Sequence, residues 1–419
     1  MSIYSRRRRA RRSIVVLSLL AFMAGACSNG NPSPPSSPAG GFDVRDWNSV
    51  LAAARGQTVD WWIYGGDERI NTFVNGYVKD ELAKLGVTLN AVKYNDTVEA
   101  VNKVLGERQA GRTSDGSVDL IWINGENFKT AKQADLLHCG HVRALPNAKY
   151  LNFDDPAVAS DYGLPVDDCE TPWVRAQSVV VYDSAKVQAG DIHSVDALFA
   201  FARNHPGSFG YAAPPELSGS MALRTFFIAR AGGYRNVAGA FDRATYDRTA
   251  PALWRALNDV EPYLWRGDNY ATRQADVVRA FSQGELSVYL TYGAGGVGLS
   301  VQNGTFPATT RELMFDSGNL GNISFTAIPK NAADKAGALV LSNLLLAPAA
   351  QYENQRATGL FPAIDVSRTA PADAAKFASI PTPPAQLPLA DLVRKSVPEI
   401  QAEWVTMLER DWKANVQEK

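Results

Sequence analysis

Two apolar runs typical of buried strands each end in polar, turn-forming residues. One run ends in Trp62-Ile63-Tyr64-Gly65-Gly66-Asp67, and the other ends in Ile121-Trp122-Ile123-Asn124-Gly125-Glu126-Asn127-Phe128. In an open parallel sheet, the residues just beyond the carboxyl ends of the strands line the ligand crevice. Aromatic rings beside carboxylates suit a cation, through ring-face attraction and charge pairing, or a polyol. The two strand ends therefore predict one wall of a small-molecule site, and loops that merely turn the chain are the alternative.

A second group of candidate residues starts a later helix. Ser218-Gly219-Ser220 precedes the helix expected at Met221–Ala231, and the free N–H groups of a helix start suit an anion such as phosphate or carboxylate. A zwitterion could use both groups. The candidate ligand-binding residues are Tyr64, Gly65, Asp67, Asn124, Glu126, Asn127, Trp173, Ser218, Ser220, Tyr289, Tyr292 and Asn322.

Catalytic patterns are weak in this chain. Asp119 with Glu126, or Asp67 with Glu68, could form an acid/base pair, but glycosidase chemistry depends on a separation that the sequence does not fix. The sequence contains no G-x-S-x-G nucleophile elbow. We therefore expect no catalytic residue and no enzymatic activity. A secreted, membrane-anchored hydrolase acting on a glycan or ester is the alternative.

Three motifs suggest cofactors, and each has a plainer interpretation. Gly293–Gly298 fits G-x-G-x-x-G, but Asn303-Gly304 ends the helical run too early for a dinucleotide site, which favours a glycine-rich turn lining a cleft. His138-Cys139-Gly140-His141 has no second pair of ligands at zinc-finger spacing. Tyr289 and Tyr292 could bind ferric iron, although wall aromatics are the favoured interpretation. We expect no metal and no cofactor.

The N-terminus has the pattern of an export signal. Arginines at positions 6–9, 11 and 12 precede the apolar run Ile14–Met23 and the small residues 24–26. The run is shorter than the ~20 residues of a membrane-spanning helix. Cys27 after small residues resembles a lipobox, which implies a signal peptide at 1–26 and acylation, with palmitate among the chains, of Cys27. An ordinary signal with a chance cysteine is the alternative, and both Sec and twin-arginine export remain open.

Residues 27–45 are rich in proline and serine, which predicts an extended stalk that tethers the protein to the outer face of the cell membrane. The net charge of −1 includes arginines that leave with the signal, so the mature chain is acidic and lacks the basic stripe of a nucleic-acid binder. Contact with the membrane is expected through the lipid alone. Cys139 and Cys169 remain as an even pair, which predicts a disulfide in an oxidising compartment, with two free thiols as the alternative.

Strands and helices alternate along the rest of the chain. Strands are expected at 59–64, 87–93 and 118–123, with helices at 71–85 and 97–109 between them. This order predicts a parallel sheet with helices on both faces. A second α/β unit follows, with strands at 286–291 and 323–328, helices at 246–261, 272–283 and 332–346, and two C-terminal helices at 389–396 and 399–415.

This order resembles an extracellular solute-binding protein of an ABC importer, in the two-lobed type II class. The run Ile123–Phe128 is similar to the YnjB-like branch of that class. Gly321–Pro329 resembles the returning strand of the branch, and Lys335–Pro348 resembles its alanine-rich helix followed by proline.

The resemblance implies an α/β, type II periplasmic-binding-protein fold with a ligand cleft between two lobes. Lobe 1 would comprise 57–170 and the returning segment 323–419 with the C-terminal helices, and lobe 2 would comprise 173–322. We expect the chain to cross between lobes near Thr171–Ala176 and Gly321–Phe325. A monomer would capture a small solute by hinge closure and deliver it to permease and ATPase subunits. The identity and charge of the solute remain open.

Overall fold

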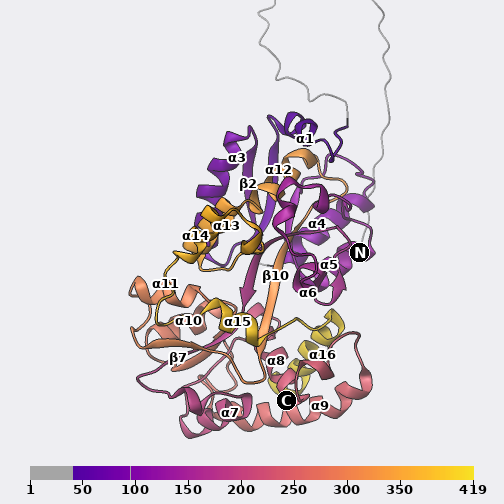
Figure 1. Ribbon diagram of the computed structural model, residues 1–419. Helices are drawn as coiled ribbons and strands as arrows, with labels where there is room; N and C mark the ends of the chain where they lie inside the picture. Colours follow the sequence, from indigo (N-terminus) through magenta and orange to yellow (C-terminus); the bar gives the residue numbers. More distant parts are fainter. Residues whose placement is uncertain (1–40, 95) are drawn as a thin grey trace, which may run out of the picture. The chain divides into compact units, whose positions relative to one another are not determined.

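The computed structural model describes residues 41–94 and 96–419 (Figure 1). The expected signal peptide, Cys27 and most of the expected stalk lie outside these residues. Within the described ranges, no helix is long and apolar enough to cross a membrane.

Lobe 1 is built on a mixed sheet in the order β11-β10-β3-β1-β2, with β6 also paired to β10. Its strands β1 (Thr58–Tyr64), β2 (Thr88–Tyr94) and β3 (Leu120–Ile123) are parallel, while β10 (Asn319–Ala327) runs antiparallel to β3. This confirms the parallel sheet predicted for the first three strands.

Helices cover both faces of this sheet because successive strand residues point to opposite sides. Val59, Trp61 and Ile63 face α1 (Trp47–Ala54), α2 (Glu68–Phe73) and α12 (Lys335–Leu345). Ile121 and Ile123 face α4 (Thr97–Gln109) and α5 (Gly125–Gln133). The remaining lobe 1 elements are α3 (Lys79–Lys84), α6 (Pro156–Ala159), β4 (Ser160–Asp161), β5 (Leu164–Pro165), α13 (Pro348–Thr358) and α14 (Pro371–Ala378).

Lobe 2 is built on a smaller antiparallel sheet in the order β8-β7-β9. These strands are β7 (Val179–Asp183), β8 (Val288–Thr291) and β9 (Thr310–Leu313). Val180 and Tyr182 pack in a core with α7 (Val195–Asn204), α8 (Leu217–Arg230) and α9 (Arg243–Val260). Val179 and Val181 pack in another core with α10 (Gln274–Ser282) and α11 (Gly296–Gln302).

Two long strands join the lobes. β6 (Thr171–Gln177) pairs antiparallel with β10, from Thr171 opposite Thr326 to Gln177 opposite Gly321. Both strands leave the lobe 1 sheet at one end and reach lobe 2 at the other, as Figure 1 shows for β10. The segments expected as crossings, Thr171–Ala176 and Gly321–Phe325, fall within these two paired strands. A third connection follows α14, where the carbonyl of Ala385 accepts a hydrogen bond from the backbone N–H of Glu312 in lobe 2.

The C-terminal segment differs from the expectation that it joins lobe 1. It forms α15 (Leu389–Lys395), β11 (Ser396–Val397) and α16 (Ala402–Trp412), and Figure 1 shows α16 beside α8 and α9. Trp404, Leu408 and Trp412 pack into the lobe 2 core. Their spacing of four residues makes an apolar stripe on one face of the helix. The stripe is visible in the sequence, but the surface that it covers is not.

The structure contains the predicted disulfide between Cys139 and Cys169. The bridge follows α5 and fixes the loop that carries His138 and His141, whose rings stack with centroids 5.5 Å apart. His141 is buried, and burial lowers its pKa to about 4. The His138–His141 segment is thus a packed turn beside a disulfide.

Candidate functional site

A buried ion pair in lobe 2 organises the candidate site. Arg224, on α8, is 2% exposed, and Glu399, between β11 and α16, is 5% exposed. Nε of Arg224 donates to Oε2 of Glu399 at 2.9 Å, and Nη2 donates to Oε1 at 3.2 Å. Burial raises the pKa of Glu399, and the Arg224 charge opposes that shift. Removing either partner would leave a buried charge uncompensated.

The other contacts of Arg224 reach three further side chains. Its Nη1 donates to the hydroxyl of Ser220, which donates in turn to Glu409. Its Nη2 lies 3.1 Å from the hydroxyl of Tyr292, which donates to Glu399. The same Nη2 lies 3.5 Å from the hydroxyl of Tyr162, which belongs to lobe 1. We call Tyr162, Ser220, Arg224, Tyr292, Glu399 and Glu409 the interlobe cluster.

Tyr162 reaches lobe 2 from the tip of the β4–β5 hairpin. Tyr162 has φ 43° and Gly163 has φ 70°, so both loop residues are left-handed, as a two-residue type I′ turn requires. Asparagine or glycine usually occupies the first of these positions, and an aromatic residue there carries backbone strain. The hairpin is fixed to α5, since the N–H of Gly125 donates to Asp161 at 2.6 Å.

Carboxylates from both lobes lie close enough to raise one another's pKa values at the cluster. Burial raises the pKa of Asp161 well above its usual range, and the charge of Glu126 adds to that shift. Burial also raises the pKa of Glu409, and Glu126 again contributes. Glu126 itself is exposed at the start of α5. Arg224 thus favours ionisation of Glu399 and Glu409, whereas burial and the charge of Glu126 oppose it, and a cation at this place would favour the ionised carboxylates.

The start of α8 lies near the end of β1. Burial raises the pKa of Tyr64, and the carboxylates of Glu216 and Asp67 raise it further. Glu216 accepts hydrogen bonds from the N–H groups of Ser218 at 2.8 Å and Gly219 at 3.0 Å. The chain's own carboxylate therefore occupies the helix start where the sequence suggested an anion, and this argues against a bound phosphate or carboxylate there.

Two predicted wall residues are packed in hydrophobic cores. Trp173 is 1% exposed, and its ring packs edge-on against Trp61 and Trp122. Tyr289 is 2% exposed and packs against Phe281 and Phe306. Neither ring is presented to a solute in this conformation.

The polar residues at the strand ends mainly support the local backbone. The side chain of Asn124 donates to the carbonyl of Ile323 at 2.8 Å, which ties the start of α5 to β10. Asp67 caps α2 and pairs with Arg69; burial raises its pKa, but the hydrogen bonds and charge of Arg69 give a net lowering. Asn127 contacts Glu126 at 3.4 Å.

Gly65 and Asn322 are the remaining predicted site residues. The carbonyl of Gly65 accepts a hydrogen bond from Asn71 at 2.9 Å. Asn322 lies in β10 opposite Ala176, where the paired crossing strands run between the lobes. The structure therefore brings Ser220 and Tyr292 into contact with Arg224 and places Glu126 near Glu399 and Glu409. It places Tyr64 and Ser218 near Glu216 and distributes the other candidates elsewhere.

The lobes also meet at the glycine-rich turn of Gly293–Gly298. Nη1 of Arg69 in lobe 1 donates to the carbonyl of Gly296 at 3.2 Å. A Cβ on Gly295, which has φ 84°, would lie 2.0 Å from the carbonyl oxygen of Gly359 in lobe 1. Only glycine permits this approach. The helix α11 at this turn has only 7 residues, which is too short for the dinucleotide site that the motif suggested. The turn instead forms a contact between the lobes.

The carboxylates proposed for hydrolysis have structural roles. Asp119 accepts the N–H groups of Asp60 at 2.9 Å and Asp334 at 2.8 Å, which connects β1 to the start of α12. Burial raises its pKa to about 6. Asp119 therefore accepts backbone hydrogen bonds inside lobe 1, and Asp67 caps α2.

Sequence reasoning missed Arg224, Glu399, Tyr162 and Glu409. A signal existed for Arg224, which is a charge in the middle of the mainly apolar run Met221–Ala229. No local pattern marks Glu399, because its partner is separated from it by 175 residues.

Comparison with known proteins places these features in a family. Residues 76–382 match the family of bacterial extracellular solute-binding proteins, and the chain belongs to that family. It is therefore the solute-binding protein of an ABC transporter, exported from the cytoplasm, with the type II periplasmic-binding-protein fold. Proteins of this kind bind small solutes and work with an ABC permease.

Individual relatives agree with this assignment. The chain is 34% identical over 307 residues to protein YnjB of Escherichia coli K12, covering 73% of this chain and 79% of YnjB. Its fold is similar to the spermidine/putrescine substrate-binding protein PotD of Streptococcus pneumoniae, with a TM-score of 0.58, 13% identity and coverage of 86% and 99% of the two chains. It is also similar to the periplasmic binding protein AfuA of Actinobacillus pleuropneumoniae, with a TM-score of 0.60, 10% identity and coverage of 86% and 99%.

Proposed function

We propose that this protein captures a small organic cation between its lobes and delivers it to the permease. The observation that carries this proposal is the excess of carboxylates over arginine at the interlobe cluster. Arg224 is the cation that acts on Glu399 and Glu409, the charge of Glu126 acts on both of these and on Asp161, and burial raises the pKa of Asp161, Glu399 and Glu409. An ammonium group would replace the missing positive charge and would lower those pKa values on binding.

Glu126 and Glu409 are the carboxylates that a solute can reach first. Glu126 is exposed and Glu409 is half-buried, whereas Asp161 and Glu399 are buried behind them. The ring faces of Tyr64 and Tyr292 offer further attraction for a cation. The solute would enter while the lobes are apart and would be enclosed as they close about β6 and β10.

The ligands of proteins with similar folds do not decide whether this solute is a cation or an anion. PotD is a spermidine/putrescine substrate-binding protein, whereas the AfuA structure holds fructose-6-phosphate. In this chain Glu216 already caps α8, which supports the cation over a phosphorylated solute.

We also propose that the exported chain is anchored through acylated Cys27 and acts as a monomer on the outer face of the membrane. The small residues before Cys27 and the proline-rich stalk support this proposal. The solute would leave the protein chemically unchanged. No observation favours the hydrolase, because the candidate carboxylates Asp67 and Asp119 are committed to backbone hydrogen bonds.

A thermal-shift screen tests the solute class, because a ligand that binds the native state alone raises the melting temperature. Putrescine, spermidine and choline represent cations, fructose-6-phosphate represents anions, and glucose represents neutral polyols. We expect the cations alone to raise the melting temperature. A shift with fructose-6-phosphate and none with the cations would contradict the proposal.

A further inference from the structure

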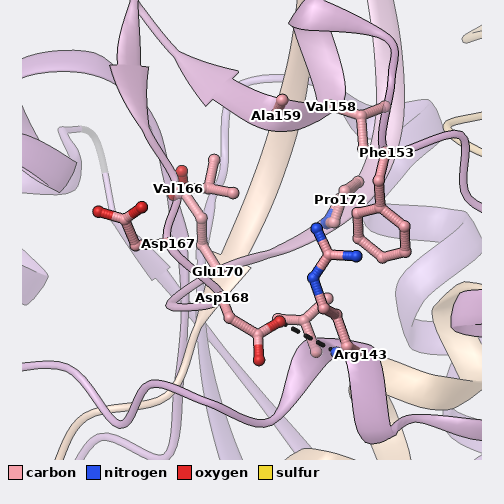
Figure 2. A pocket seen from close by; sticks show the side chains of 10 residues that line it. Arg143, Phe153, Val158, Ala159, Val166, Asp167, Asp168, Glu170 and Pro172 are labelled. Carbon is pink, nitrogen blue, oxygen red and sulfur yellow. Dashed lines mark hydrogen bonds between the residues drawn. The ribbon is translucent and has the colours of Figure 1, made fainter.

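A pocket of about 290 Å³ lies within lobe 1 and contains no residue of the interlobe cluster (Figure 2). Its walls come from the turn at Val142–Ala144, the end of α6 and the segment between β5 and β6. Phe153, Val158 and Pro172 supply apolar surface. This volume is at the small end of ligand sites, so it suits a molecule of amino-acid size.

Glu170 is an unsatisfied acceptor in this pocket. It is 0% exposed, and neither carboxylate oxygen has a hydrogen-bond partner in the part of the chain that the structure describes. Its position is fixed on both sides, since Cys169 is in the disulfide and Thr171 begins β6. Burial raises the pKa of Glu170 well above its usual range. A cationic donor beside it would offset the cost of burying its charge.

Arg143 is an exposed cation at the same pocket whose guanidinium has no partner among the described side chains. Its guanidinium lies 3.9 Å from the ring centroid of Phe153, and no ion pair or hydrogen bond joins that guanidinium to another described residue. Its backbone is held by the hydrogen bond from its N–H to Asp168 at 3.0 Å. Figure 2 shows Arg143 beside Phe153 and Pro172 on one side of the pocket, with Glu170 on the other.

The other charged groups at the pocket have partners. Asp167 pairs with Lys132 at 2.7 Å, and Asp168 accepts the N–H of Arg143. The pocket therefore has one carboxyl group and one guanidinium without side-chain partners among the described residues, across a partly apolar space.

We propose that this pocket binds a small zwitterion of amino-acid size, with its ammonium group on Glu170 and its carboxylate on Arg143. An amine alone would leave the guanidinium unpaired, and a simple carboxylic acid would leave Glu170 unpaired. A zwitterion satisfies both groups at once. This site is separate from the interlobe cluster and does not depend on the solute that the cluster binds.

Calorimetry on the full chain with three matched probes tests the proposal. L-alanine carries both charges, ethylamine lacks the carboxylate, and propionate lacks the ammonium group. We expect alanine to bind, and we expect each of the other probes to bind at least about tenfold more weakly, because each loses one charge-assisted hydrogen bond. Ethylamine or propionate binding as tightly as alanine would overturn the zwitterion, and absence of alanine binding would overturn the site.

Substitutions of the two charged residues test whether the probe binds in this pocket. Arg143→Gln and Glu170→Gln should each weaken alanine binding at least about tenfold. Lys149→Gln is a matched control, because Lys149 is also an exposed cation over an aromatic ring, that of Tyr150, but lies outside the pocket lining. It should leave alanine binding unchanged. Arg143 is exposed, so its variant should fold even if the Glu170 variant does not.

An ion pair between Arg143 and Glu170 is the alternative, and it predicts the opposite results. If Arg143 turned to pair with Glu170 instead, alanine would not bind, and Arg143→Gln would lower the melting temperature in the absence of any probe. That result would overturn the proposal.

Discussion

Arg224 and Tyr162 meet between the two lobes. The guanidinium of Arg224, on α8 of lobe 2, lies 5.5 Å from the ring centroid of Tyr162, at the tip of a lobe 1 hairpin. Tyr162 adopts φ 43°, a conformation that costs an aromatic residue on the order of 1–3 kcal/mol and that concentrates at functional sites. Tyr162, the residue with the strained backbone, is thus the lobe 1 residue that contacts the buried Arg224.

Arg224→Met should destabilise the protein by about 3–5 kcal/mol, because it leaves the buried carboxylate of Glu399 without its cation. Urea unfolding measures the change. The double variant Arg224→Met with Glu399→Leu removes both charges and should recover most of the loss. A single variant as stable as the wild type would show that the ion pair does not stabilise the fold.

Glu312 should make stability depend on pH. Burial raises its pKa from the ordinary 4.5 to about 7. The folded protein therefore holds this proton more tightly than the unfolded chain, so the free energy of unfolding should fall as pH rises between those two values. The shift corresponds to a loss of about 3 kcal/mol.

Glu312→Gln should flatten that part of the stability profile, as measured by urea unfolding at several pH values. The N–H groups of Gly295 and Leu387 donate to different oxygens of Glu312, and the glutamine keeps an acceptor for only one of them. The slope of stability with pH, and not its absolute value, is therefore the informative quantity. An unchanged slope would assign the pH dependence to other groups.

Much of this architecture was predictable from the sequence. The alternation of strands and helices predicted the parallel strands of lobe 1. The segments Thr171–Ala176 and Gly321–Phe325, expected as crossings, fall within the paired strands β6 and β10. These features follow from local periodicity and from the resemblance to a known fold.

The candidate site was less predictable, because it depends on contacts between distant segments. Nothing near Glu399 in the sequence indicates that it meets Arg224. Trp173 and Tyr289 follow the same pattern as wall aromatics, yet the surrounding rings bury them. The apolar stripe of α16 was visible in the sequence. Its packing in lobe 2 depends on the apolar surface of α8 and α9, which the sequence does not show.

Gly295→Ala should weaken solute binding by disturbing the lobe contact. The added Cβ would clash with the carbonyl of Gly359, so the closed state becomes less populated and the apparent affinity falls by the same factor. Gly304→Ala is the control: Gly304 also has positive φ, but a Cβ there meets no atom within 4 Å. Calorimetry with putrescine should show a loss for Gly295→Ala alone. Equal losses in both variants would attribute the effect to backbone strain.

Cys27→Ser should release the protein from the membrane or leave its signal peptide uncut, because serine cannot carry the thioether-linked lipid. Fractionation and mass spectrometry of expressing cells measure both effects. Unchanged membrane retention and unchanged mass would contradict the lipid anchor.

Calorimetry of putrescine binding to the wild type and to Glu126→Gln tests the acidic interlobe site most directly. Glutamine keeps the shape of Glu126 and removes its charge. Asp80→Asn, an exposed change on α3, controls for net charge. We predict that Glu126→Gln weakens putrescine binding by about 2–5 kcal/mol, as expected when a charge pair loses one partner, and that Asp80→Asn has no effect. Putrescine binding that is unchanged in Glu126→Gln, or absent from the wild type, would contradict the account.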